Sequence, residues 1–498
     1  MASSRRMRAF KRWMKYQSVE YSDALDLIIQ QEDQQVSVKA LCDLHEGDLI
    51  ATIPKRSCLT VKSSAVCHLI EDFCLEGYMA LSVALMFEKS LGQNSPWYDY
   101  LHLMPDCNPD VPLLWSLDEI DHLLMGTELH KTVKEDKALV YDDWKACIVP
   151  FVESAPIELN PEDFGVEQYF AAKSLISSRS FQIDDHYGFG MVPLADLFNH
   201  KTNAEDVHFT SVSDDDTSEN IEEQVVDDDD DDRDGDPQNE SNVASPKSDF
   251  NGDDDGVSPT TEILEMIMVR DVKAGAEVFN TYGSMGNAAL LHRYGFTEPD
   301  NPYDIINIDL DIVLQWSSSL FSSRHTRTRL SFWKSLLHLH HPESQNQQIE
   351  YFEISYEGEP ELELLKLIFI ILLPEKEYND LYHGVSNGQK FGKSRIVLGE
   401  VSETNKDVLL TENVRRGLLS VVDIRERCYG LRSMEDDVEA LRKCCNNVLE
   451  KKLYHSLVLR VSERRILEKL RGYAGGGGGG GGRWINNGCN GSTMKKNV

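Results

Sequence analysis

The sequence lacks features that would mark it as a membrane protein or a zinc protein. Its longest apolar run, 364–373, contains Lys366 and stops before Pro374, far short of the roughly 20 residues that cross a bilayer. None of its ten cysteines forms a C-x-x-C pair, and no histidine accompanies them at zinc-ligand spacing. We therefore expect no membrane span, no metal and a reducing compartment, with 364–373 forming a buried helix.

Positive charge is also scarce, since 50 Lys and Arg face 84 Asp and Glu for a net charge of −34. Phosphate binding depends on basic side chains, so this balance argues against nucleic acid and anionic lipid as partners and favours a basic protein. Half of the excess lies in 211–256, where 19 acidic residues and 2 basic ones give 2 − 19 = −17.

Two segments have compositions that cannot bury enough apolar surface to fold. The acidic segment, about 211–258, contains six consecutive aspartates at 227–232, and the tail, 474–498, contains eight glycines at 475–482. We expect a disordered surface loop and a disordered tail. For the acidic loop, a solvated linker and a lure for basic substrates are both open interpretations.

The basic N-terminus could belong to a transit peptide or a nuclear address, but its apolar spacing predicts a structural helix. Phe10, Trp13 and Met14 recur at i, i+3 and i+4, and Leu25 and Ile28–Ile29 repeat that spacing.

Strand-like and helical patterns then alternate along the chain. Short β-type runs with turn signals occur at 37–61, 189–198 and 262–283, and helical periodicity fills about 77–170. Beyond about Tyr303, helical periodicity dominates apart from a strand candidate at 305–314. The pattern predicts a discontinuous β unit with inserted helices, followed by a mostly α domain.

Polar residues gather at the ends of two apolar runs. In VPLADLFNH (192–200), Asp196, Asn199 and His200 follow a strand-like run, and an ordinary Asx turn would look similar. In EVFNTYGSMGNAALLHRYGF (277–296), Tyr282 and Tyr294 flank a short helical run, so two phenols could converge on one cavity.

These two blocks, in this order, resemble the SET-domain methyltransferases of the class related to Rubisco large-subunit and ribosomal-protein lysine methyltransferases. The likeness includes SPWYDYLHLMP (95–105), SSRSF (177–181) and KALCDLHEGDLIATIP (39–54), and covers about residues 10–300. It implies an α+β chain. A SET catalytic β-fold would occupy 1–300 with a helical insertion at about 77–175, and an all-α substrate-binding domain would occupy 301–473.

The resemblance also implies roles for individual residues. Tyr282 would be catalytic, and the cofactor S-adenosylmethionine would be held by Gln34, Gln35, Val36, Arg179, Asn199, His200, Tyr282 and Tyr294. Substrate would be bound by Trp97, Phe181, Asp196 and Tyr294. One departure is that Gln34-Gln35-Val36 stands where the family has a glycine-rich turn, which restricts close backbone approach to the cofactor.

The implied function is a protein-lysine N-methyltransferase that acts, as a monomer in the nucleus or cytoplasm rather than a plastid, on an accessible lysine of a protein substrate. The Tyr282 hydroxyl would stabilise the positive charge as it moves from sulfur to nitrogen. Two alternatives are open: a non-catalytic SET-like scaffold that binds protein partners, and a histidine methyltransferase.

Overall fold

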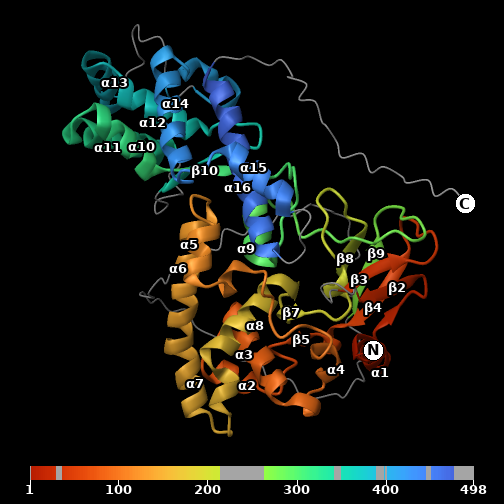
Figure 1. Ribbon diagram of the computed structural model, residues 1–498. Coiled ribbons are helices and arrows are strands. Elements are labelled where there is room, and N and C mark those ends of the chain that lie inside the picture. The colour runs from red at the N-terminus through yellow and green to blue at the C-terminus, as the bar shows by residue number, and fades with distance from the viewer. Residues whose placement is uncertain are drawn as a thin grey trace, which may run out of the picture. The chain divides into compact units, whose positions relative to one another are not determined.

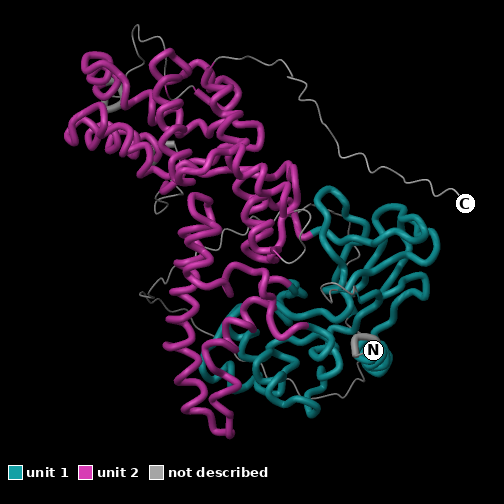
Figure 2. Tube along the Cα trace, viewed as in Figure 1, with its two compact units in different colours: residues 1–104, 179–281 teal, residues 105–178, 282–498 magenta. Residues whose placement is uncertain are grey.

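The computed structural model describes residues 2–29, 36–212, 263–340, 349–387, 398, 401–444 and 450–475. The chain forms two compact units, unit 1 with residues 1–104 and 179–281, and unit 2 with residues 105–178 and 282–498 (Figures 1 and 2). Nearly all of the expected acidic loop, and the tail beyond Gly475, lie outside the described residues. The units group 105–178 and 282–300 with the C-terminal helices, and a catalytic-domain boundary at 300 stays a prediction.

The described residues of unit 1 form three small antiparallel sheets. Their strand orders are β1-β4-β9-β8, β2-β3 and β5-β7-β6. The strands are β1 (Glu20–Tyr21), β2 (Leu25–Ile29), β3 (Val36–Ala40), β4 (Leu49–Pro54), β5 (Leu59–Thr60), β6 (Ser180–Asp184), β7 (Gly188–Met191), β8 (Val207–Val212) and β9 (Ile263–Met268). Strands from both ends of the unit's sequence therefore pair, as the discontinuous β pattern predicted.

The N-terminal helix is present, but it is shorter than its apolar spacing suggested. α1 (Ala2–Tyr16) buries Phe10, Trp13 and Met14, as the i, i+3, i+4 spacing requires. Leu25–Ile29, which repeats that spacing, is instead the strand β2, paired in register with Val36–Ala40. A short apolar run fits both periods, and here the tertiary pairing decides.

The other helices of unit 1 are α2 (Cys67–Asp72), α3 (Gly77–Ser90) and α4 (Tyr98–Leu101). The strand expected over 189–198 is confined to 188–191. A 3-10 turn, Ala195–Leu197, takes up its second half.

Where it is described, unit 2 is mostly helical, with one two-stranded sheet formed by β10 (Ile306–Asp309) and β11 (Tyr351–Ile354). Its helices are α5 (Leu117–Leu123), α6 (Leu129–Asp143), α7 (Val149–Ser154), α8 (Val166–Arg179), α9 (Asn287–Tyr294), α10 (Leu310–Leu320), α11 (Ser323–His340), α12 (Leu362–Leu372), α13 (Glu375–Asn387), α14 (Glu412–Arg427), α15 (Met434–Cys444) and α16 (Lys451–Ala474). The apolar run expected to be a buried helix is α12, and six of its residues are fully buried.

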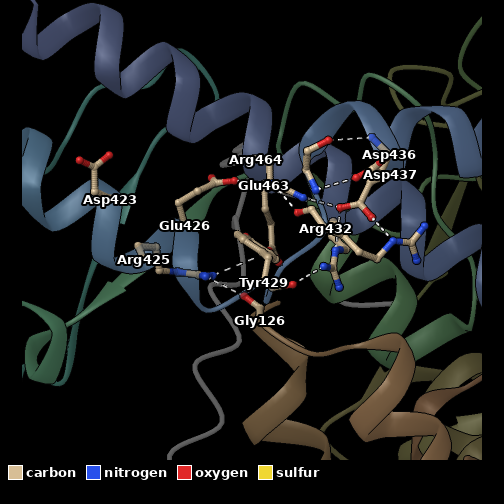
Figure 3. Close-up of polar contacts among 12 residues, drawn as sticks. Gly126, Asp423, Arg425, Glu426, Tyr429, Arg432, Asp436, Asp437, Glu463 and Arg464 are labelled. Carbon is tan, nitrogen blue, oxygen red and sulfur yellow. Dashed lines mark hydrogen bonds and ion pairs between the residues drawn. The ribbon is translucent and has the colours of Figure 1, made fainter.

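A buried polar network around Tyr429 joins the C-terminal helices of unit 2 (Figure 3). The Tyr429 hydroxyl donates to Glu463 at 2.5 Å, and the Arg425 guanidinium lies over the Tyr429 ring and donates to the Gly126 carbonyl at 2.7 Å. Asp437, which is fully buried, accepts from two arginines of α16. Each buried charge here has a partner, which is the condition for tolerating it.

Within the described part of the chain, no helix is both long and apolar enough to cross a membrane.

Candidate active site

Three segments far apart in the sequence meet in unit 1 beside the Asn-His pair. The Val278 N–H donates to the Val38 carbonyl at 2.8 Å, which ties the stretch before the tyrosine block to β3. Lys39 and Glu277 form an antiparallel bridge at the same place. Val36, which was predicted to contact the cofactor, is the first residue of β3. It therefore lies on a strand that is hydrogen-bonded to residues 277–278. Gln34 and Gln35 lie outside the described residues.

The Asn-His pair is hydrogen-bonded to the same stretch, two residues further along the chain. The Asn280 N–H donates to the Asn199 carbonyl at 2.9 Å, and His200 forms a parallel bridge with Asn280. His200 and Asn280 are both buried, and the His200 ring lies 3.2 Å from the Thr202 hydroxyl. The two sequence blocks are therefore joined through the backbone two residues before Tyr282.

The Asn199 side chain is held by a residue from the second block. Its Nδ2 donates to Oε1 of Glu277 at 2.7 Å, across 78 positions of sequence. The alternative of an Asx turn that closes on its own neighbours does not describe the Asn199 side chain, since this amide donates to Glu277, 78 positions away.

Asp196 lies at the centre of a buried polar group. Its Oδ2 accepts from the Tyr100 hydroxyl at 3.1 Å and from the Arg179 guanidinium at 3.2 Å, while its side chain is 0% exposed. Burial raises the pKa of the Asp196 carboxyl above its usual value, and the Arg179 charge opposes that shift. Among the described residues, Oδ1 has no hydrogen-bond partner, so this oxygen is an acceptor without a donor.

The turn that carries Asp196 is strained. Leu194 adopts φ 77° and ψ −49°, close to a γ-turn and unusual for a branched side chain. Such a conformation costs about 1–3 kcal/mol and persists only where the surroundings impose it. Leu194 is fully buried, so packing fixes the direction in which Asp196 leaves the turn.

Two further predicted substrate residues also lie in unit 1. Phe181 is on β6 opposite Gly190, and its ring lies 5.3 Å from that of Phe209. Trp97 is only 5% exposed, and its indole N–H donates to the Ser57 carbonyl at 3.0 Å. That burial leaves Trp97 little surface to offer a substrate, whereas Phe181 is half-buried.

The two predicted phenols lie together in unit 2. The rings of Tyr282 and Tyr294 are stacked with centroids 4.4 Å apart, and Phe296 lies 6.4 Å and 6.2 Å from them. Gly295 ends α9 at φ 81°, and a Cβ there would meet Asp110 backbone at 2.8 Å. Glycine is therefore required between Tyr294 and Phe296.

Reasoning from the sequence did not find two of the residues that hold this site. Tyr100 lies inside the quoted stretch SPWYDYLHLMP, and Glu277 opens the tyrosine block. In both cases the sequence offered one signal of a role in the site, which was a polar residue within or at the start of a recognised motif. Neither could be assigned without knowing its distant partner, Asp196 for Tyr100 and Asn199 for Glu277.

Curated proteins similar to this chain are methyltransferases by name. N-lysine methyltransferase setd6 of Danio rerio is 28% identical over 351 residues, which cover 66% of this chain and 65% of that protein. Ribosomal lysine N-methyltransferase 3 of Saccharomyces cerevisiae is 27% identical over 330 residues, covering 56% and 59%. The chain thus spans less than two thirds of the length of these relatives. No protein-family model matches it.

Solved structures similar to this chain are SET-domain proteins. The SET domain of LSMT bound to lysine and AdoHcy has a TM-score of 0.60 at 19% identity, covering 95% of this chain and 91% of that one. Rubisco LSMT bound to AdoMet has a TM-score of 0.57 at 18% identity, covering 94% and 91%. The expected α+β SET fold is confirmed. In sequence the chain is similar to these N-lysine methyltransferases, and its fold is that of the LSMT structures.

Proposed function

We propose that the protein is an S-adenosylmethionine-dependent protein-lysine N-methyltransferase. The observation that carries this proposal is the junction at which Asn199 and His200 are hydrogen-bonded and bridged to Asn280, two residues before Tyr282. The names of the similar proteins, N-lysine methyltransferases, and the AdoMet or AdoHcy bound in the similar structures support the same activity.

The residues present at the junction fit this cofactor. The half-buried Asn199 offers an amide oxygen to a donor, since its nitrogen is already bound to Glu277. The methyl donor supplies an electrophilic methyl group on a sulfonium, so the protein's task is chiefly to align the acceptor nitrogen with it. Alignment of that kind is worth about 7–11 kcal/mol in favourable systems. We assign Asn199, His200, Val36 and Arg179 to cofactor binding.

The aromatic residues suit the acceptor side of the reaction. A lysine amine has an ordinary pKa of about 10.4 and must lose its proton before it can accept a methyl group. Tyr282, Tyr294 and Phe296 would exclude water from the side chain, and desolvation favours the neutral amine. In this proposal, the Tyr282 hydroxyl stabilises the positive charge as it passes to nitrogen.

The buried carboxylate suits the substrate side. Asp196 keeps one oxygen without a donor among the described residues, and an N–H of a bound peptide or lysine could supply one. The net charge of −34 favours a basic protein as substrate. We include Phe181 and Trp97 among the residues that contact the substrate. We also propose that the protein acts as a monomer in the nucleus or cytoplasm.

Labelled-methyl transfer tests the activity and its catalytic residue. Purified protein, incubated with labelled S-adenosylmethionine and cell extract, should label protein bands, and Tyr282→Phe should abolish most of the labelling. Tyr16→Phe is the matched control, because Tyr16 is 85% exposed on α1. Mass spectrometry of the product should find methyllysine. Methylhistidine would contradict the substrate class, and full activity of Tyr282→Phe would contradict the role of Tyr282.

A further inference from the structure

The hydrogen bond between Asn199 and Glu277 has a defined polarity. An amide side chain can present either its oxygen or its NH₂ group, and the two look alike in shape. An ionised carboxylate only accepts hydrogen bonds. With Glu277 at 2.7 Å, the group facing it must be the NH₂ of Asn199, so the amide oxygen must point the other way.

Glu277 can impose this polarity because its backbone is fixed. Glu277 is bridged to Lys39 of β3, and the next residue, Val278, donates to the Val38 carbonyl at 2.8 Å. The carbonyl of Asn199 is held at the same time by the Asn280 N–H. Backbone hydrogen bonds thus hold both Asn199, the donor, and Glu277, the acceptor. The orientation of the Asn199 amide is therefore set before a ligand binds.

The oxygen of the Asn199 amide is left available. Within the described residues, the bond to Glu277 is the one hydrogen bond of the Asn199 side chain, and both residues are half-buried rather than exposed. An acceptor oxygen with a carboxylate behind its amide attracts hydrogen-bond donors, and cationic donors most strongly. The same arrangement repels a ligand that presents an acceptor.

We infer that Glu277 is a positioning residue for the methyl donor: it turns the Asn199 amide so that its oxygen accepts from the ammonium group of S-adenosylmethionine. This inference rests on the proposed function and adds a residue to it. Glu277 acts through Asn199 and needs no contact with the ligand. The affinity for the amino-acid part of the cofactor therefore depends on the Glu277 carboxylate, although the ligand does not contact it.

Calorimetry with two ligands tests the inference. S-adenosylmethionine carries the ammonium group, and 5′-methylthioadenosine lacks the amino-acid part altogether. Glu277→Lys replaces the acceptor by a donor, which turns the Asn199 amide round and presents its NH₂ group to the ligand ammonium. It should therefore weaken S-adenosylmethionine binding by about 10- to 100-fold, the range for losing a hydrogen bond to a charged group. Binding of 5′-methylthioadenosine should stay within about twofold. Glu265→Lys, on β9 of the same unit, is the matched control for the change of charge.

A reversed pair provides the rescue. In Asn199→Asp alone, two carboxylates face each other and binding should be weak. In Asn199→Asp combined with Glu277→Gln, the Gln NH₂ can donate to the Asp, whose second oxygen accepts from the ammonium, and affinity for S-adenosylmethionine should return. Thermal unfolding of each variant verifies that it is folded.

The outcomes separate this inference from the proposed function. If the wild-type protein binds S-adenosylmethionine and Glu277→Lys binds it equally well, or loses both ligands equally, the role of Glu277 is refuted while the function stands. If the wild-type protein binds neither ligand, both are refuted.

Discussion

Tyr100→Phe removes one hydroxyl from the buried group around Asp196 and leaves the ring in place. The ring is stacked on Trp13 at 5.8 Å and lies 5.9 Å from Phe10, so packing against α1 should survive the change. The lost bond joins the Tyr100 hydroxyl to Oδ2 of Asp196 at 3.1 Å, and both residues are buried. A hydrogen bond to a charged group contributes about 1.5–3 kcal/mol, so we expect the free energy of unfolding at neutral pH to fall by that amount.

The loss should depend on pH in a definite direction. The pKa of the Asp196 carboxyl is raised by burial, while the Arg179 charge and the Tyr100 hydroxyl lower it. Without the hydroxyl the pKa rises further, so the folded variant binds a proton more readily than the folded wild type. Its deficit should therefore be full above the pKa of Asp196 and shrink as the pH falls through that value.

Urea denaturation at neutral and mildly acidic pH measures both effects. Tyr98→Phe is the matched control, because Tyr98 lies on the same short helix, α4, and its hydroxyl makes no hydrogen bond within the described residues. A Tyr100→Phe protein as stable as the Tyr98→Phe protein at neutral pH would refute the reasoning. So would a deficit that grows as the pH falls.

Two further predictions concern the polar network of unit 2. Gly126→Ala should lower the free energy of unfolding by about 1–3 kcal/mol, because Gly126 has φ 82° and an added Cβ would lie 2.6 Å from the Cys428 carbonyl oxygen; an unchanged urea midpoint would contradict this. Burial raises the pKa values of Glu128 and Glu463 above the ordinary carboxyl range. Because the folded protein then binds protons more readily than the unfolded chain, the free energy of unfolding should increase as the pH falls through those raised values. The increase should be at most about 1.4 kcal/mol per pH unit for each group. Glu128→Gln should flatten that dependence, and an equally steep profile in the variant would show that Glu128 is not its source.

The parts of the fold that the sequence predicted well are those with one dominant signal. α12 follows from nine apolar residues in the run 364–373, and α1 follows from Phe10, Trp13 and Met14 on one face. Leu25–Ile29 has five residues and fits both a helix and a strand, so only its pairing with Val36–Ala40 decides. The apolar pattern of five residues does not report which neighbouring segment they pair with.

The candidate site shows the same division. Asn199, His200 and Tyr282 could be picked out because they stand in recognisable blocks after strand-like apolar runs. Glu277 and Tyr100 could not, because their importance comes from partners 78 and 96 positions away. Trp97 was predicted to contact substrate, but its 5% exposure and its bond to Ser57 are features of a packed tryptophan, and that role stays a prediction.

The central claim is that the Asn-His pair and the stretch leading to Tyr282 hold one methyl donor between them. Ultraviolet crosslinking of labelled S-adenosylmethionine, followed by peptide mapping, tests it most directly. The label should appear on peptides that contain 199–200 and 277–282, and an excess of unlabelled S-adenosylmethionine should remove it. Label that maps to other parts of the chain, or that unlabelled cofactor does not displace, would contradict the claim.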